Sequence, residues 1–199
     1  LYTLSGRANL ETGWGRAGES WRFIAAVEEL GGETWFSLGD TDLAIHAVRT
    51  AALARGETLT AVTRALSHAL GIEAAILPAS DQPVETVVET EVGRLSFQRY
   101  FVEHRCAPAV RAIHFPGAAE AHPTAEIEAA LTAGDLEAIV ICPSNPYLSI
   151  DPILAIPGLR ALVELARAPV VGVSPLVGSK ALKGPLAKIM SELGHSLTP

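Results

Sequence analysis

Apolar residues recur at helical spacing in three segments of the N-terminal part of the chain. In residues 19–30 they stand three positions apart, and a glycine pair stops the pattern where a helix cap is expected. Similar apolar faces occupy residues 40–56 and 58–71, each ended by a glycine. The pattern predicts three successive helices that form a small helical lobe at about residues 18–71.

Polar residues at the start of two of these segments suit helix caps, because their side-chain oxygens can accept hydrogen bonds from free backbone N–H groups. Asp40 or Thr41 is the predicted cap of the second helix, and Thr58 or Thr60 that of the third. Trp21 lies on the apolar stripe of the first helix, which favours a core position over a ligand contact.

Short β-prone runs dominate the rest of the chain, which predicts a sheet-forming part at about residues 72–199. The runs are residues 74–77, 84–90, 95–97, 110–115, 138–142 and 169–173. The second and third run read as a hairpin. Helical patterns at 124–131 and 159–166 separate the last three runs, and alternating strands and helices predict parallel pairing. Ligands of such sheets bind beyond the carboxyl ends of the strands, so the loops after residues 141 and 173 matter most.

Composition narrows the class of protein. The 199 residues, 49% hydrophobic and 19% charged, suffice for one domain with a full core. The formal charge of −7 and the scattered basic residues argue against a nucleic-acid partner. No apolar run approaches the roughly 20 residues of a membrane span, so we expect a soluble, cytoplasmic protein. We expect Cys106 and Cys142 to be buried free thiols, and the opening at Leu1 suggests a fragment.

The loop from Cys142 to Pro152 begins where a predicted strand ends and holds two serine hydroxyls and an amide among three prolines. Proline restricts the backbone, so this loop loses little entropy on binding. Asn145 can donate to and accept from a base edge, and Ser144 and Ser149 can bind phosphate. The alternative is an ordinary turn of residues that favour turns.

The loop from Val173 to Pro185 follows another predicted strand and carries two lysines into a helix expected to start near Pro185. Backbone amides at a helix start, with a lysine nearby, suit a diphosphate. The order of a Walker motif is absent, and surface lysines are commonly just solvated.

Two further stretches lie in the predicted helical lobe. Rings and guanidinium groups cluster between Gly13 and Arg22 and could stack on an extended heterocycle. Asp42, His46 and Arg49 share a helical face by their spacing and could bind phosphate or move protons. A solvated face with local ion pairs is the alternative reading of that row.

Taken in order, the strings LYTLSG, GWGRAGESW, LGDTDLAIHAVRT, CPSNPYLSIDPIL and SPLVGSKALKGP resemble the 2-phospho-L-lactate transferase family over nearly the whole chain. The resemblance implies an α/β, Rossmann-like, mostly parallel sheet with helices on both faces and a helical lobe, as a single transferase domain. It also implies magnesium-assisted transfer of a phospholactyl or enolpyruvyl-phosphate group from a guanosine diphosphate adduct. The acceptor would be the deazaflavin 7,8-didemethyl-8-hydroxy-5-deazariboflavin, and GMP would be released in coenzyme F-420 biosynthesis.

The same resemblance assigns residues to the substrates. Nucleotide-side residues are Ser144, Asn145 and Ser149, and phosphate-side residues are Ser174, Gly178 and Lys183. Deazaflavin-side residues are Trp14, Arg16, Ser20 and Arg22, with Asp40, His46 and Arg49 as looser assignments.

In the family a glycine-rich loop and an Asp-rich metal motif precede the LYTLSG string. We therefore expect the magnesium ligands and the catalytic base to lie upstream of Leu1, name no metal residue, and expect the chain alone to transfer poorly. The rival is a nucleotide-sugar-binding regulatory protein of the gluconeogenesis-factor type, against which GWGRAGESW and LGDTDLAIHAVRT argue. The sequence leaves open the three-carbon acid of the donor and the oligomeric state, for which a homodimer is one option.

Overall fold

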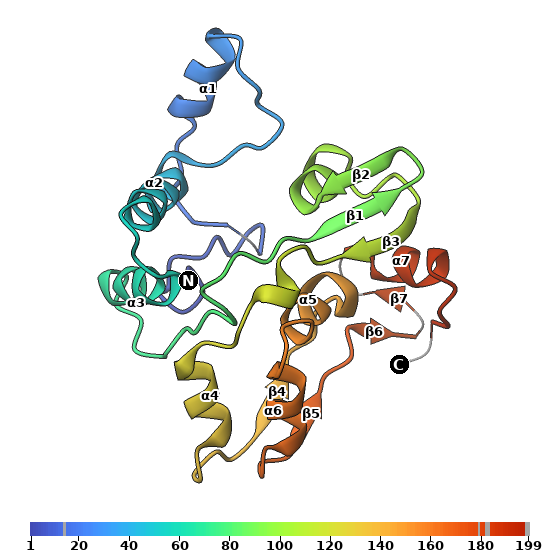
Figure 1. Ribbon diagram of the computed structural model, residues 1–199. Helices are drawn as coiled ribbons and strands as arrows, with labels where there is room; N and C mark the ends of the chain where they lie inside the picture. Colours follow the sequence, from blue (N-terminus) through green and yellow to red (C-terminus); the bar gives the residue numbers. More distant parts are fainter. Residues whose placement is uncertain (14, 179, 182–183, 198–199) are drawn as a thin grey trace. The chain divides into compact units, whose positions relative to one another are not determined.

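The computed structural model describes residues 1–13, 15–178, 180–181 and 184–197. The chain divides into two compact units, Leu1–Pro78 and Ala79–Pro199 (Figure 1). Helices and strands alternate in the second unit, so the predicted α/β class is confirmed. Within the described ranges, no helix has the length and apolar character needed to cross a membrane.

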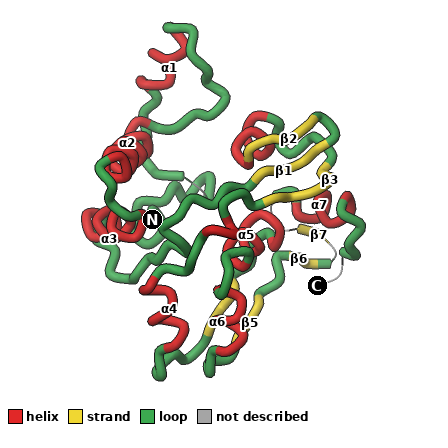
Figure 2. The backbone as a smooth tube through the Cα atoms, viewed as in Figure 1, coloured by secondary structure: helices red, strands yellow, loops and turns green. Residues whose placement is uncertain are grey.

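The first unit contains the three helices that the apolar pattern predicts: α1 (Arg22–Glu29), α2 (Asp40–Ala54) and α3 (Leu59–Ala69). Most of this unit outside the helices is loop (Figure 2). The hydroxyl oxygen of Thr58 accepts a hydrogen bond from the Ala61 N–H, so the predicted cap of α3 is confirmed.

Two predictions for this unit are wrong. Trp21 is not a core residue: it is 52% exposed, because α1 has no buried residue and packs only lightly on α2. Residues 74–77 form no strand, because no other segment of the described chain pairs with them. A four-residue apolar run does not by itself distinguish a strand from a packed loop.

The second unit begins with the predicted hairpin, β1 (Val87–Thr90) and β2 (Gly93–Ser96). The π-helix η1 (Arg99–Glu103) returns the chain to β3 (Val110–His114), which pairs with β1. Helix α7 (Leu186–Glu192) packs on this sheet, and Val88, Tyr100, Val110 and Ile189 form the buried core between them. The sheet thus supports both η1 and the start of α7.

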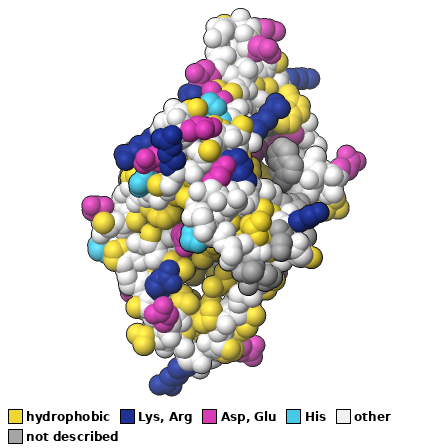
Figure 3. Space-filling view, turned by 90° about the vertical axis from the view of Figure 1, so that its right-hand side faces the viewer, with side chains coloured by type: hydrophobic (Ala, Val, Ile, Leu, Met, Phe, Trp, Pro, Cys, Tyr) yellow, Lys and Arg dark blue, Asp and Glu magenta, His cyan; other side chains and the backbone are white. Residues whose placement is uncertain are grey.

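Strands β4 (Ile139–Ile141) and β5 (Val170–Gly172) are parallel, as predicted from the strand and helix order. The elements between them are η3 (Pro146–Ile150), α5 (Asp151–Leu154) and α6 (Leu159–Leu165). The 3-10 helix η2 (Ala118–Glu120) and helix α4 (Ala125–Thr132) precede β4. Val140, Val170 and Val171 of these two strands are exposed. Figure 3 shows hydrophobic side chains gathered in the lower part of the face that it draws.

The expected parallel pairing does not extend to residues 110–115. In the described chain, β3 is antiparallel to β1, because η1 brings it back beside the hairpin as a third strand. Strands β6 (Leu176–Val177) and β7 (Lys180–Ala181) form a further antiparallel pair. Both cysteines are free thiols as predicted, but the expectation that both are buried is wrong, since Cys106 is half-buried and Cys142 is exposed.

Candidate functional site

A cavity of about 670 Å³ lies in the second unit, where the connections after β4 and β5 meet. This is the carboxyl end of the parallel pair, where ligands of α/β sheets bind, and its volume is that of a small-molecule site. The connection after β4 contributes Pro143, Ser144, Asn145, Leu148 and Ser149. The other lining residues are Phe97, Phe101, Pro175, Gly184, Pro185 and Leu186.

The two polar atoms of the Asn145 side chain differ in their hydrogen bonding. Its Oδ1 accepts hydrogen bonds from the N–H groups of Tyr147 at 3.1 Å and Leu148 at 3.2 Å, which caps η3. Its Nδ2 is buried and has no hydrogen-bond partner in the described part of the protein. A buried donor without a partner is costly, and an acceptor atom of a ligand would remove that cost.

The structure brings most of the predicted nucleotide and phosphate residues together. Ser144 and Ser149 line the cavity with Asn145, and the Ser149 N–H donates to the Asn145 carbonyl oxygen at 2.9 Å. Ser174 lines a neighbouring cavity of about 360 Å³ that shares Ser144, and its Oγ accepts from the Leu176 N–H at 3.1 Å. Gly178 lies between β6 and β7 with a φ of 56° and lines neither cavity. The assignment of Lys183 falls outside the described residues.

The carboxylates of Asp40 and Glu19 cap the starts of α1 and α2, respectively. Asp40, the first residue of α2, accepts hydrogen bonds at the start of α1 from Ser20 Oγ at 2.7 Å and from the N–H groups of Arg22 and Phe23. Glu19, which precedes α1, accepts from Thr41 and from the Asp42 N–H at the start of α2. The hydrogen bond from Ser20 is the main cause that lowers the pKa of Asp40.

This exchange corrects the predicted cap of α2. Neither Asp40 nor Thr41 caps that helix, because the cap position is Gly39 and the capping carboxylate comes from Glu19. Gly39 is buried, and a Cβ there would lie 2.4 Å from Glu19 Oε2. The glycine of the LGD string therefore makes room for the capping carboxylate.

Loss of this cap should destabilise the first unit. We expect Glu19→Ala to lower its free energy of unfolding by about 1–2 kcal/mol, because the first N–H groups of α2 lose their acceptor. Gly39→Ala should lower it too, since the added methyl group displaces the carboxylate. Urea unfolding followed by circular dichroism measures the change. Glu29→Ala, an exposed position of α1, is the control, and an equal loss there would contradict the capping role.

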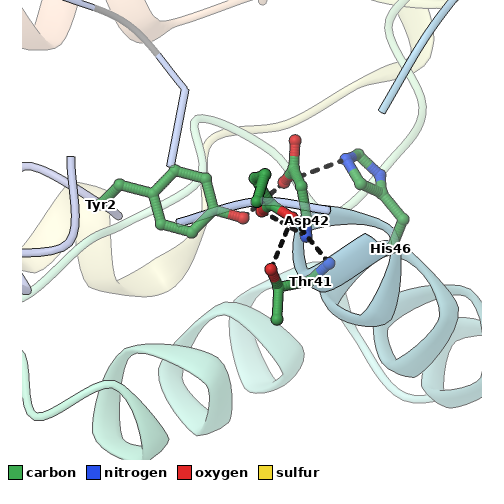
Figure 4. Close-up of polar contacts among 5 residues, drawn as sticks. Tyr2, Thr41, Asp42 and His46 are labelled. Carbon is green, nitrogen blue, oxygen red and sulfur yellow. Dashed lines mark hydrogen bonds and ion pairs between the residues drawn. The ribbon is translucent and has the colours of Figure 1, made fainter. Parts of the chain in front are cut away.

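Asp42 joins Tyr2 and His46 at the same helix start (Figure 4). The Tyr2 hydroxyl donates to Asp42 Oδ1, and His46 Nε2 lies 3.9 Å from the same oxygen. Burial, and then the hydrogen bond to Asp42, raise the pKa of Tyr2, so the phenol stays protonated. Arg49, the third residue of the predicted row, is exposed and forms no ion pair with Asp42 in the described structure.

The other predicted deazaflavin-side residues also belong to the first unit. Arg16 is half-buried and forms an antiparallel bridge with Ala8, while the side chain of Arg22 is exposed. Ser20 is engaged with Asp40. The assignment of Trp14 falls outside the described residues.

Two aromatic residues of the large cavity escaped the sequence analysis. Phe97 and Phe101 stack with ring centroids 5.4 Å apart and an interplanar angle of 25°. Their spacing of four positions is typical of one helical face and could have indicated the pair. The sequence analysis instead assigns residues 95–97 to a strand of the hairpin, where such a spacing has no helical meaning.

The described residues contain no group of side chains that would form a magnesium site by themselves. Across these residues, no group of three or more His, Cys, Asp or Glu side chains could hold a metal ion. Carboxylates are the protein ligands that magnesium prefers, and those near the helix starts are already engaged as caps.

Comparison with known proteins places this geometry in context. A family model described as 2-phospho-L-lactate transferase CofD matches residues 17–198. Phosphoenolpyruvate transferases from Kitasatospora aureofaciens and Mycobacterium tuberculosis H37Rv are 40% and 37% identical to the chain over 203 and 205 residues. These matches cover 100% of this chain but only 63% and 61% of those proteins, so the chain spans less than two thirds of their length.

Solved structures resemble the fold at low sequence identity. Two crystal structures of a UPF0052 family protein from Bacillus halodurans align with TM-scores of 0.50 and 0.52, at 20% and 18% identity. They cover 66% and 79% of this chain, and 40% and 50% of the other chains. At such identity the likeness concerns the fold alone.

Proposed function

Because the chain belongs to the 2-phospho-L-lactate transferase CofD family, we propose that it forms the nucleotide-binding part of a transferase of coenzyme F-420 biosynthesis. The donor is a guanosine diphosphate adduct of a phosphorylated three-carbon acid. The acceptor is the hydroxyl of 7,8-didemethyl-8-hydroxy-5-deazariboflavin, and GMP is the leaving group.

The observation that carries this proposal is the cavity at the carboxyl ends of β4 and β5, which is lined by Asn145, a residue whose buried Nδ2 has no hydrogen-bond partner in the described part of the protein. The Nδ2 group would donate to an acceptor atom of the nucleotide, and the Ser144 and Ser149 hydroxyls would donate to its phosphate oxygens. Phosphoryl transfer depends mainly on such positioning and charge neutralisation. The proline-flanked loop would supply the positioning.

The deazaflavin is assigned to the first unit. The planar guanidinium groups of Arg16, Arg22 and Arg49 suit stacking on a flat heterocycle. Magnesium would neutralise phosphate charge during transfer, but we assign it no ligand in the described chain and derive no step through it.

Ligand-induced thermal stabilisation tests the proposal. Guanosine diphosphate should raise the unfolding midpoint of the chain, since a ligand at about 100 times its Kd stabilises the folded state by about 2.7 kcal/mol. The deazaflavin should also raise the unfolding midpoint, whereas a uridine diphosphate sugar should leave it unchanged. Stabilisation by the uridine sugar alone would contradict the transferase and support a nucleotide-sugar-binding protein.

A further inference from the structure

The aromatic pair leaves part of its apolar surface uncovered. Phe97 follows β2, and Phe101 stands one turn later in η1, so the rings stack on each other at the cavity wall. Phe101 is nevertheless 42% exposed. A flat heterocycle placed on this pair would cover that surface and continue the stack.

A basic residue lies just beyond the pair. Arg105 lines a second cavity of about 400 Å³, which shares Phe101, Gly184 and Pro185 with the large one. The two cavities therefore adjoin. The ammonium of Lys188, also in the second cavity, is engaged with Glu192 and with the Pro108 carbonyl oxygen at 2.7 Å. The guanidinium of Arg105 forms no hydrogen bond or ion pair with the described residues.

The backbone holds Arg105 in an unusual conformation. Arg105 and Cys106 have φ values of 51° and 57°, in the left-handed region that side chains other than those of Gly, Asn and Asp rarely adopt. The Cys106 N–H donates to the carbonyl oxygen of the buried Tyr100 at 2.8 Å, which anchors the turn to the core. Such strain persists where the surrounding structure enforces it, often at binding sites.

We infer that the segment from Phe97 to Cys106 forms the second wall of the nucleotide pocket, in which Phe97 and Phe101 stack on the base and Arg105 pairs with the diphosphate. The inference rests on the proposed function for the identity of the nucleotide. A guanidinium suits a diphosphate because its planar donors match two phosphate oxygens.

Calorimetric titration of the full chain with guanosine and with guanosine diphosphate separates the two contributions. Arg105→Asn keeps a residue that tolerates the left-handed region but removes the charge. It should weaken guanosine diphosphate binding about ten- to hundredfold and change guanosine binding less than twofold. Phe101→Leu should weaken the binding of both ligands about tenfold. Phe101→Tyr should bind both as the parent chain does, because it retains an aromatic ring.

Arg167→Asn is the matched control, since Arg167 is also exposed but lines neither cavity, and it should bind both ligands as the parent chain does. If the parent binds guanosine diphosphate and Arg105→Asn and Phe101→Leu are unchanged, the inferred wall is wrong and the proposed function stands. If the parent binds uridine diphosphate, titrated in the same way, instead of guanosine diphosphate, and the variants weaken that binding, the wall stands and the guanosine assignment fails. A parent chain that binds no nucleotide contradicts both.

Discussion

Asn145→Asp is expected to weaken guanosine diphosphate binding by about a hundredfold while leaving the fold of the second unit intact. The substituted side chain keeps the oxygen that accepts from the Tyr147 and Leu148 N–H groups, so η3 remains capped. The buried Nδ2 donor, however, becomes an acceptor that carries negative charge. A lost donor and a like charge near phosphate together cost about 3 kcal/mol, which is about a hundredfold in Kd.

Two comparisons separate binding from folding. Asn145→Ala removes the cap as well as the donor, so it should also lower the free energy of unfolding by about 1–2 kcal/mol. Asn9→Asp is the matched control, because Asn9 Oδ1 accepts from the Glu11 and Thr12 N–H groups in the same pattern but in the first unit. Calorimetry and thermal unfolding measure both effects. If Asn145→Asp binds guanosine diphosphate as tightly as the parent chain does, the Asn145 amide does not contact the nucleotide.

Local patterns explain why much of the fold is predictable. Helices α2 and α3 follow from apolar periodicity, and the Thr58 cap follows from the chemistry of its hydroxyl. The antiparallel pairing of β3 with β1 cannot be predicted in this way, because it depends on the path that the chain takes through η1. Pairing is a tertiary property.

The same distinction applies to the site. The place of Asn145 at a cavity could be predicted, because a polar residue among prolines at the end of a strand is a local signal. The capping role of Asp40 could not, since its acceptor oxygens serve a helix that begins 18 residues earlier in the chain. The place of Arg105 at a cavity could not be predicted for a related reason: nothing in the neighbouring sequence shows that the backbone turns left-handed there.

Ile189→Ala should produce the largest loss of stability. Ile189 is fully buried between α7 and the sheet, against Val88, Tyr100 and Val110. Removing its side chain beyond Cβ leaves a void that this packed core cannot refill without moving α7, and such substitutions cost about 2–5 kcal/mol. The first turn of α7 contributes Leu186 to the wall of the cavity, so nucleotide binding should weaken as well, although Ile189 does not line the cavity.

Urea unfolding followed by far-ultraviolet circular dichroism gives the loss of stability. Calorimetric titration of the folded variant with guanosine diphosphate gives the loss of affinity. Leu165→Ala removes a side chain of the same size from α6, where Leu165 is 82% exposed, and should change the unfolding free energy by less than about 0.5 kcal/mol. Equal effects of the two substitutions would mean that α7 is not held by this core. If Ile189→Ala is stable and binds guanosine diphosphate as the parent chain does, the cavity wall does not depend on the packing of α7 against the sheet.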